Sequence, residues 1–566
     1  MTDHEPPNRG GGPLARRDYE LALALVLVAT LVLLPGLFFG LPGKGVAGGV
    51  RVLHGEVPYR DFWTMYAPGM FYATAGVFRV FGIEILAQGA VSVLLDASLV
   101  AVAFLLLRRL AQGRTVAFVL ALVFLGAFWK TGREITSYPP ALFFLLLFWH
   151  GLIGYWEHGG PRRLLYAGLS AGLAACFKHD VTAYVVLAAV ASLFLSWHLA
   201  ADRRPPRWAH PTVATLVLAA GALATFLPAA AWIAWQAGAD AWQDLFVFPV
   251  VTFPKVMVPY YPPLLPPLGS FWSLLQEFSL QKARGFLVDL SEWLLCNVPQ
   301  YAFVVAAVVV IRLRRSLAPA TLATILMLLV ALPFFWAAAH IQQNTHLTSM
   351  ALIGLSFAAM CWPRLRGTDS GVRWTRRALV GGCALVAIGL WLQAAMNMVL
   401  MRMEWRDGQV LDVPGTRGLH VPSRVYEAYP PIIAFLQANT GEDERIYVGL
   451  ARHDAIVIND WSLHVLARRR SCSHYPELHR GVADVAEGQR EIIRDLERHR
   501  VRAVVLWKFG WRDSVLDRRL ALHRANIPEL GSTVLDEYIA KHFDLLAQYG
   551  EYLLMWRKGI PKPKLG

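Results

Sequence analysis

Long apolar segments recur along this 566-residue chain, and each approaches the length that crosses a lipid bilayer. A transmembrane helix needs about 20 mainly apolar residues, because the hydrocarbon core of a bilayer is about 30 Å thick. By this criterion about eleven spans are predicted. They lie near residues 20–40, 87–107, 115–129, 139–155, 164–177, 181–198, 212–236, 297–312, 318–338, 346–362 and 377–400. The predicted fold class is therefore a polytopic α-helical membrane protein.

The charge content agrees with this class and restricts the choice of partners. Only 17% of the residues are charged, against roughly a quarter in soluble globular proteins. The formal net charge is +14, but membrane proteins collect Lys and Arg in their cytoplasmic loops, so no nucleic-acid partner is predicted. The five cysteines are scattered without metal-like spacing, and they imply no disulfide framework.

Basic clusters mark one side of the predicted spans. They fall at alternate span ends, and clusters of this kind are retained on the cytoplasmic side of a membrane. We therefore predict a disordered cytoplasmic N-terminus at 1–19, a transmembrane domain at 20–400, and outer loops at 41–86 and 237–296. The clusters include Arg16-Arg17, Arg108-Arg109, Arg162-Arg163, Arg203-Arg204, Arg314-Arg315 and Arg376-Arg377.

Residues 401–566 differ from the spans before them because they are charged and periodic. Residues 445–449 and 501–507 have the composition of buried strands, and 487–500 has the spacing of an amphipathic helix. A further helix at 535–542 and a final strand at 549–557 are also predicted. This pattern indicates a C-terminal α/β domain. The predicted topology leaves the domain on the outer, extracytoplasmic face.

The loop from Gly55 to Met70, after the first span, places Asp61 between an arginine and several aromatic side chains. Asp61 directly follows Arg60, and Pro58 and the Pro68-Gly69 pair prevent a helix from crossing the loop. Two interpretations are open at this point. The loop is either a ligand site with one carboxylate, or a connector whose aromatic residues form an interfacial belt.

Three more charged groups are predicted at the same depth, where ionisable residues are costly and suggest function. Lys130 and Arg133 have an equally good explanation as basic side chains that snorkel to the interface. Histidines at helix ends are more often hydrogen-bonded than metal-bound. The turn at 178–180 favours function, because charged or titratable residues occupy nearly all of it. The candidates are Lys130, Arg133 and Glu134; Lys178, His179 and Asp180; and His340 and His346.

Several signatures of soluble enzymes are absent from the sequence. There is no Walker loop, no GxGxxG after a strand, no HExxH, no GxSxG and no DxD. The predicted cytoplasmic loops are too short to bind a nucleotide donor. We therefore expect any substrate to arrive from the membrane.

Short motifs give the chain a family resemblance. The first loop reads Gly55-x-x-Pro58-Tyr59-Arg60-Asp61-Phe62 and then Tyr66-x-Pro68-Gly69. Further matches are Phe177-Lys178-His179-Asp180 with Tyr184, Phe248-Pro249, Asn459-Asp460-Trp461, Tyr475-Pro476-Glu477-Leu478 and Leu535-Asp536-x-Tyr538-Ile539. In these stretches the chain resembles membrane glycosyltransferases of the GT-C fold, in particular bacterial relatives of the dolichyl-phosphate-mannose protein mannosyltransferases (family 39). It departs from that family at Leu41–Val50, where many members carry an acid and this chain has none.

The resemblance implies an inverting glycosyltransferase of a bacterial plasma membrane. The donor would be a polyprenyl-phosphate-linked sugar, and the acceptor would be an extracytoplasmic glycan, lipid or protein. Asp61 would be the general base, and Lys178, Arg133 and Lys130 would hold the donor phosphate. Arg60 would contact either the phosphate or Asp61. Substrate contacts would come from Tyr59, Trp63, Tyr66, Glu134, His179, Asp180, Tyr260, His340 and His346. No cofactor is indicated, and a divalent metal ion is left open.

Other functions were weighed against this one. A glycan ligase on the same fold is the nearest alternative. A lipid-linked glycan transporter or flippase is less favoured, because the predicted charges gather at one interface and no two-fold repeat is visible. A structural protein whose C-terminal domain binds a partner would not need so many titratable groups at one depth.

Overall fold

We describe the fold from a computed structural model of the chain. The description covers residues 14–41, 43–111, 113–128, 133–199, 210–256, 265–279, 282–297 (without 284, 288, 292 and 296), 319–339, 352–360 (without 358), 370–454, 459–508 and 531–563. The predicted spans near 297–312 and 346–362 lie largely outside these residues. The predicted disordered N-terminus lies mostly outside them as well.

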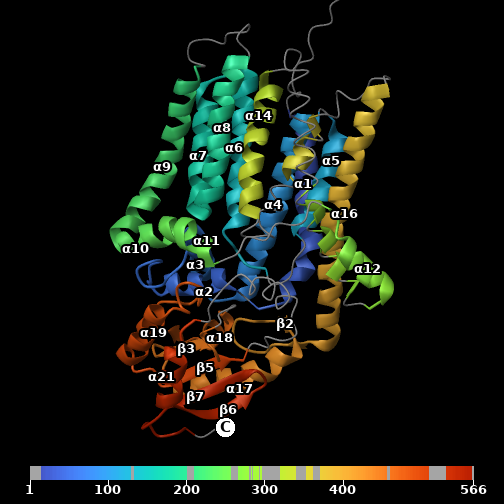
Figure 1. Cartoon of the computed structure of the whole chain (residues 1–566). Coiled ribbons are helices and arrows are strands. Elements are labelled where there is room, and N and C mark those ends of the chain that lie inside the picture. Colours follow the sequence, from blue (N-terminus) through green and yellow to red (C-terminus); the bar gives the residue numbers. More distant parts are fainter. Residues whose placement is uncertain are drawn as a thin grey trace, which may run out of the picture.

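A bundle of long apolar helices forms one end of the molecule (Figure 1). Within the described residues, six helical segments are long and apolar enough to cross a membrane: Arg16–Phe38, Ile85–Ala111, Tyr138–His158, His179–Leu199, Pro211–Ala237 and Val380–Asp407. The corresponding helices are α1 (Arg16–Leu33, continued by η1, Leu34–Phe38), α4 (Ile85–Ala111), α6 (Tyr138–His158), α8 (His179–Leu199), α9 (Pro211–Ala237) and α16 (Ser370–Asp407). The prediction of a multi-pass helical membrane protein is confirmed, whereas the count of eleven spans stays a prediction.

Further helices complete the bundle, and small residues determine how closely two of them pack. Helices α5 (Arg114–Leu125), η2 (Gly126–Phe128), α7 (Pro161–Phe177) and α14 (Pro319–Ala339) lie beside the long ones. Helices α7 and α9 touch through glycine. A Cβ atom at Gly168 would lie 2.2 Å from the Leu218 carbonyl oxygen, and one at Gly172 would lie 2.2 Å from the Ala222 carbonyl oxygen. Close approach at small residues is the usual way in which helices associate inside a membrane.

The segments between the spans build one end of the bundle. Helices α2 (Lys44–Leu53) and α3 (Gly69–Phe81) lie there on either side of the first loop. After α9 come α10 (Ala239–Trp242), the π-helix η5 (Gln243–Thr252), α11 (Phe253–Val256) and α12 (Leu268–Gln276). Pro249 lies inside η5 and cannot donate a backbone hydrogen bond, which is consistent with a helix of unusual pitch at this place.

The C-terminal residues fold around a five-stranded sheet of order β4-β3-β5-β7-β6. Strand β3 (Arg445–Leu450) is parallel to β4 (Arg470–Ser471) and to β5 (Ala503–Trp507), while β7 (Tyr552–Arg557) is antiparallel to β5 and to β6 (Phe543–Tyr549). The sequence pattern missed β6, which follows its helix without a break. The helices are α17 (Ser423–Asn439), α18 (Ser462–Leu466), α19 (Ala486–Arg498) and α21 (Val534–His542), and a small ribbon pairs β1 (Gln409–Val410) with β2 (His420–Val421).

This C-terminal segment lies directly against the loop end of the bundle (Figure 1). Val46, Ala47 and Val50 of α2 pack with Val465 of α18 in one apolar cluster. The first loop therefore lies between the membrane helices and the sheet. Whether this end of the molecule faces the outside of the cell stays a prediction.

Candidate active site

A tight turn in the first loop holds the carboxylate of Asp61. The Val57 N–H donates to Asp61 Oδ2 at 2.7 Å, and the Asp61 N–H donates to the Val57 carbonyl oxygen at 2.9 Å. Tyr59 inside the turn has a φ of 70°, which is an uncommon backbone conformation for a residue with a side chain. The carboxylate thus closes the turn that positions it.

Arg60 covers the same carboxylate from the other side. Its Nη2 donates to Asp61 Oδ2 at 2.6 Å, and its Nη1 donates to Gln236 Oε1 at 2.8 Å near the end of α9. Although partial burial opposes ionisation, the hydrogen bonds from Arg60 and from the Val57 N–H hold the pKa of Asp61 below its ordinary value. Asp61 is therefore an ionised and weakly basic carboxylate.

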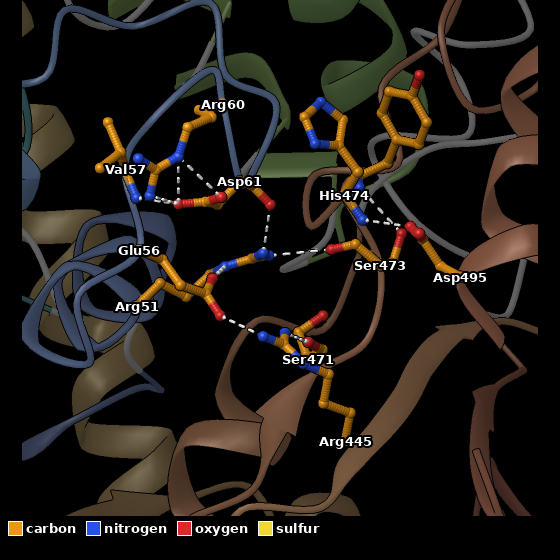
Figure 2. A network of polar contacts seen from close by, with 11 residues as sticks. Arg51, Glu56, Val57, Arg60, Asp61, Arg445, Ser471, Ser473, His474 and Asp495 are labelled. Atoms are coloured by element: carbon orange, nitrogen blue, oxygen red, sulfur yellow. Dashed lines mark hydrogen bonds and ion pairs between the residues drawn. The ribbon is translucent and has the colours of Figure 1, made fainter. Parts of the chain in front are cut away.

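Arg51 of α2 joins this turn to the C-terminal segment (Figure 2). Its guanidinium donates to the Asp61 carbonyl oxygen at 2.8 Å and to the Ser473 carbonyl oxygen at 3.0 Å. It also pairs with Glu56, which forms a second ion pair with Arg445 at 3.1 Å. Arg51 is only 5% exposed. Because an Arg side chain presents several donors in a fixed plane, Arg51 can hold α2, the turn around Asp61 and the C-terminal segment together.

A cavity of about 550 Å³ lies beside the first loop. Its walls come from 65–67, from the junction of α7 and α8, from α9 and from η5, and they are mainly apolar with a few polar groups. This volume and mixture are typical of small-ligand sites. The lining residues are Met65, Tyr66, Ala67, Ser137, Ala175, Phe177, Lys178, His179, Asp180, Thr182, Ala183, Tyr184, Val186, Phe226, Leu245, Phe246, Pro249, Val250 and Phe253.

The junction of α7 and α8 brings a cation and an acid to the cavity. Lys178 ends α7, and its N–H donates to the Ala174 carbonyl oxygen at 2.9 Å. Asp180 lies in the first turn of α8, where the helix dipole favours a negative charge. Lys178 Nζ lies 3.0 Å from Asp180 Oδ2, and Lys178 is 8% exposed. The cavity therefore carries a buried ammonium group that can receive an anion.

Four of the predicted substrate or phosphate contacts line this cavity: Tyr66, Lys178, His179 and Asp180. Tyr59 lies behind the wall, where its hydroxyl donates to the Tyr66 carbonyl oxygen at 2.8 Å. Trp63 packs against Phe248 with a ring separation of 5.0 Å, next to the same wall. The structure thus brings the first loop and the turn at 178–180 to one place.

Other predicted residues have different partners. Arg60 and Asp61 are not among the lining residues, and 42% and 31% of their side chains are exposed. Arg133 is buried and pairs with Asp96 at 2.9 Å, so its predicted phosphate contact has no support in this geometry. Glu134 accepts hydrogen bonds from the N–H groups of 43, 45 and 46, which places it at the start of α2 instead of at a sugar.

The remaining predicted residues lie outside the residues that the structure describes. They are Lys130, Tyr260, His340 and His346. Their predicted roles as phosphate or substrate contacts stay predictions.

Comparisons with known proteins show what the sequence and the fold resemble. Residues 66–232 match the family model described as dolichyl-phosphate-mannose-protein mannosyltransferase. Among solved structures, ArnT from Cupriavidus metallidurans bound to undecaprenyl phosphate matches with a TM-score of 0.51 and 12% identity, over 97% of this chain and 100% of that one. The apo state of the same enzyme matches with a TM-score of 0.48 and 12% identity, over 95% and 98%. No curated protein matches in sequence.

Residues 66–232 are thus similar in sequence to this family, and the chain is similar in fold to ArnT. This confirms the resemblance to GT-C glycosyltransferases that the sequence motifs predicted. The match at 66–232 begins at Tyr66, which lines the cavity, and it includes the turn at 178–180. The cavity is thus built largely from the part of the chain that matches the family.

The sequence analysis assigned no role in the site to three charged residues near the first loop. Lys44 places its Nζ 3.4 Å from the centre of the Tyr66 ring. Glu477 is 9% exposed and accepts from the Thr64 hydroxyl at 3.4 Å. Asp244 of η5 is 8% exposed, and burial, followed by the charge of Asp240, raises its pKa to about 7. A possible signal for Lys44 was its charge, since it is the only charged residue in 41–50.

Proposed function

We propose that this chain transfers a sugar from a polyprenyl-phosphate-linked donor to an acceptor on the outer face of a bacterial plasma membrane. The observation that carries the proposal is the cavity itself, because apolar walls and a buried Lys178 suit a lipid-linked phosphate. In the division of the chain that we propose, residues 20–400 bind the donor. Residues 401–566 then form an extracytoplasmic domain that covers the site.

The proposed reaction is an inverting displacement. The acceptor hydroxyl attacks the anomeric carbon as the bond from that carbon to the donor phosphate oxygen breaks, so the sugar changes configuration. The polyprenyl phosphate leaves with an additional negative charge, and the Lys178 ammonium stabilises that charge. Before the reaction, Lys178 Nζ forms an ion pair with Asp180 Oδ2 at 3.0 Å, so the ammonium is held in place before the donor arrives. Tyr66 and Tyr184 supply aromatic walls for the sugar ring.

Asp61 is the proposed general base that accepts the proton of the acceptor hydroxyl. It is ionised and partly exposed, so an acceptor can reach it from water. Its low basicity suits a reaction in which a phosphate ester leaves readily and the acceptor loses its proton late. For Asp61 to accept this proton, its ion pair with Arg60 has to weaken. Asp180 is the other candidate, because it is the acid among the residues that line the cavity.

The proposal is tested with the purified full chain in detergent and a panel of polyprenyl-phosphate sugars. Transfer to lipid, glycan or protein acceptors is measured by release of polyprenyl phosphate. We expect one donor to be used. A Lys178→Met variant should weaken donor binding by roughly 10- to 100-fold, the usual value of a charge-assisted hydrogen bond.

A Lys508→Met variant is the matched control, because Lys508 is exposed in the C-terminal segment and contacts Gln548. It should bind the donor as the wild type does. Movement of a lipid-linked glycan across vesicles without any transfer would instead favour the flippase alternative. A wild type that neither binds polyprenyl phosphate nor transfers any sugar would refute the proposed function.

A further inference from the structure

The turn that carries Asp61 depends on contacts from outside it. Tyr59 has a φ of 70°, and its N–H donates to the Phe62 carbonyl oxygen at 2.8 Å, which closes the chain over Arg60 and Asp61. A residue with a side chain keeps such a conformation only where its surroundings enforce it. We therefore asked which neighbours hold this turn.

Arg51 of α2 makes the first of these outside contacts. Its Nη2 donates to the Asp61 carbonyl oxygen at 2.8 Å, and its guanidinium carbon lies 4.8 Å from the centre of the Phe62 ring. One side chain thus contacts two consecutive residues of the turn. Because Arg51 lies on a helix, it can serve as a firm support for the backbone of Asp61.

The C-terminal segment holds the Arg51 guanidinium in its turn (Figure 2). Nη1 donates to the Ser473 carbonyl oxygen at 3.0 Å, and Nε pairs with Glu56, which also pairs with Arg445 of β3 at 3.1 Å. Arg445 is itself fixed, because its Nη1 donates to the Ser471 carbonyl oxygen at 2.6 Å. The position of the guanidinium therefore depends on β3 and on the residues that follow β4.

A direct backbone bond joins the first loop to the same part of the C-terminal segment. The Trp63 N–H donates to the His474 carbonyl oxygen at 2.8 Å, and the His474 N–H donates to Asp495 Oδ2 of α19 at 3.0 Å. Two consecutive carbonyl oxygens, those of 473 and 474, thus hold the chain just before and just after Phe62. The first acts through Arg51, and the second acts directly.

We propose that the C-terminal segment is part of the catalytic apparatus and that it fixes Asp61 through the Arg51 guanidinium. Arg51 is a positioning residue, because it acts on the acceptor only through the backbone of Asp61. Its planar fork of donors joins two carbonyl oxygens, which a single ammonium group cannot do in the same way. The inference rests on the proposed function, with Asp61 as the base, and extends it by giving the C-terminal segment a role in the chemical step.

The first test replaces Arg51 with Lys in the full chain, which keeps the positive charge and removes the fork. We expect kcat for sugar transfer to fall by roughly 10- to 100-fold, since a small misplacement of a catalytic group has effects of this size. The donor KM should stay nearly the same. Thermal unfolding is measured on the same preparation. A wild-type kcat in folded Arg51→Lys would show that the charge is sufficient and would overturn the inference.

The second test asks whether Arg51 acts through Asp61. The residual transfer of Asp61→Asn is measured in single turnovers and compared with that of the double variant Asp61→Asn, Arg51→Lys. The second substitution should cause little further loss, because the effects of residues that act as one unit are not additive. A full second loss of rate would show that Arg51 acts elsewhere, and the inference would then be wrong.

An Arg469→Lys variant is the matched control. Arg469 is a buried arginine that donates to the carbonyl oxygens of Gln437 and Thr440 at 3.1 and 2.7 Å, all within the C-terminal segment. It undergoes the same chemical change away from the first loop and should keep the wild-type kcat. An equal loss of kcat in this variant would point to general destabilisation and would contradict the inference.

A variant on the other side of the interface covers the case in which Arg51→Lys does not fold. Arg445→Met removes the support that β3 gives to the guanidinium through Glu56. It should lower kcat and leave the donor KM nearly unchanged. A wild-type kcat in Arg445→Met would then overturn the inference.

Distinct outcomes separate the inference from the proposed function. A wild type that transfers sugar, together with an Arg51→Lys variant of full kcat, would overturn the inference alone. A fully active Asp61→Asn would remove the base on which the inference rests. A wild type that neither binds polyprenyl phosphate nor transfers sugar would overturn the proposed function itself.

Discussion

Arg60 Nη2 lies 2.6 Å from Asp61 Oδ2, and Arg60 Nη1 donates to Gln236 Oε1. The sequence left open whether Arg60 contacts the donor phosphate or Asp61. In the structure it contacts Asp61. The two residues therefore form one unit, in which the cation keeps the proposed base ionised and lowers its basicity.

Replacing Arg60 with Gln should raise the pKa of Asp61, because the hydrogen bond from Arg60, the one that lowers this pKa most, is lost. Only the ionised carboxylate accepts a proton, so the acidic limb of the kcat/KM profile should move to higher pH. The donor KM should stay the same. A raised donor KM with an unmoved profile would show that Arg60 serves the phosphate instead.

An Asp61→Asn variant should lose transfer by about 10²- to 10⁴-fold, the usual contribution of a general base. The amide oxygen can still accept the Val57 N–H at the 2.7 Å position, so the turn should remain. Transfer rate and thermal unfolding are measured on the same preparation. Full activity would remove Asp61 from the mechanism and leave Asp180 as the candidate.

Separating the buried pair of Arg133 and Asp96 should destabilise the bundle. Both side chains are fully buried, and Arg133 also donates to the carbonyl oxygens of Leu33 and Phe128 at 3.1 Å. Arg133→Met should lower the free energy of unfolding by about 3–5 kcal/mol, because it removes the arginine from a buried ion pair. The double variant with Asp96→Leu should recover part of the loss. A stable Arg133→Met protein with a raised donor KM would restore the predicted phosphate contact.

Asp244 should make stability fall as pH rises. Its pKa is about 7 in the folded protein against 3.8 ordinarily, so the folded state resists ionisation between these values. At low pH the side chain is protonated and does not lower the free energy of unfolding. The full loss of free energy of unfolding, up to about 4 kcal/mol, is reached above pH 7, where the side chain is ionised. Unfolding of wild type and Asp244→Asn is compared from pH 4 to pH 8. Equal slopes for the two proteins would contradict the raised pKa.

Chelation tests the question of a metal ion. Within the described part of the chain, no three His, Cys, Asp or Glu side chains come together as a metal site would require. We expect the transfer rate to be unchanged after treatment with EDTA. Loss of activity that added Mg²⁺, Mn²⁺ or Zn²⁺ restores would assign a metal ion to the reaction.

The sequence predicted those features that depend on local pattern. Apolar runs located the long helices, and the motif at 177–180 located the cavity's ammonium group. Partnerships over long distances were missed, because a pattern does not show which residues meet. Arg133 has the same neighbours in sequence whether it binds a phosphate or Asp96. Nothing in the sequence around Glu134 indicates that its carboxylate accepts hydrogen bonds from the N–H groups of Gly43 and Gly45. Lys44 contacts the Tyr66 ring only because the fold places α2 beside the first loop.

The contact between Arg51 and Ser473 also has a consequence for biosynthesis. The two residues are separated by 422 positions, so the ribosome completes nearly the whole chain before the guanidinium meets its acceptor. Domains generally fold as they emerge, from the N-terminus onward. During translation the inserted helices therefore carry an Arg51 that has its partners in the first loop but lacks its contact with the C-terminal segment. Nascent or prematurely terminated chains are thus expected to be inactive and to be preferred targets of membrane proteases.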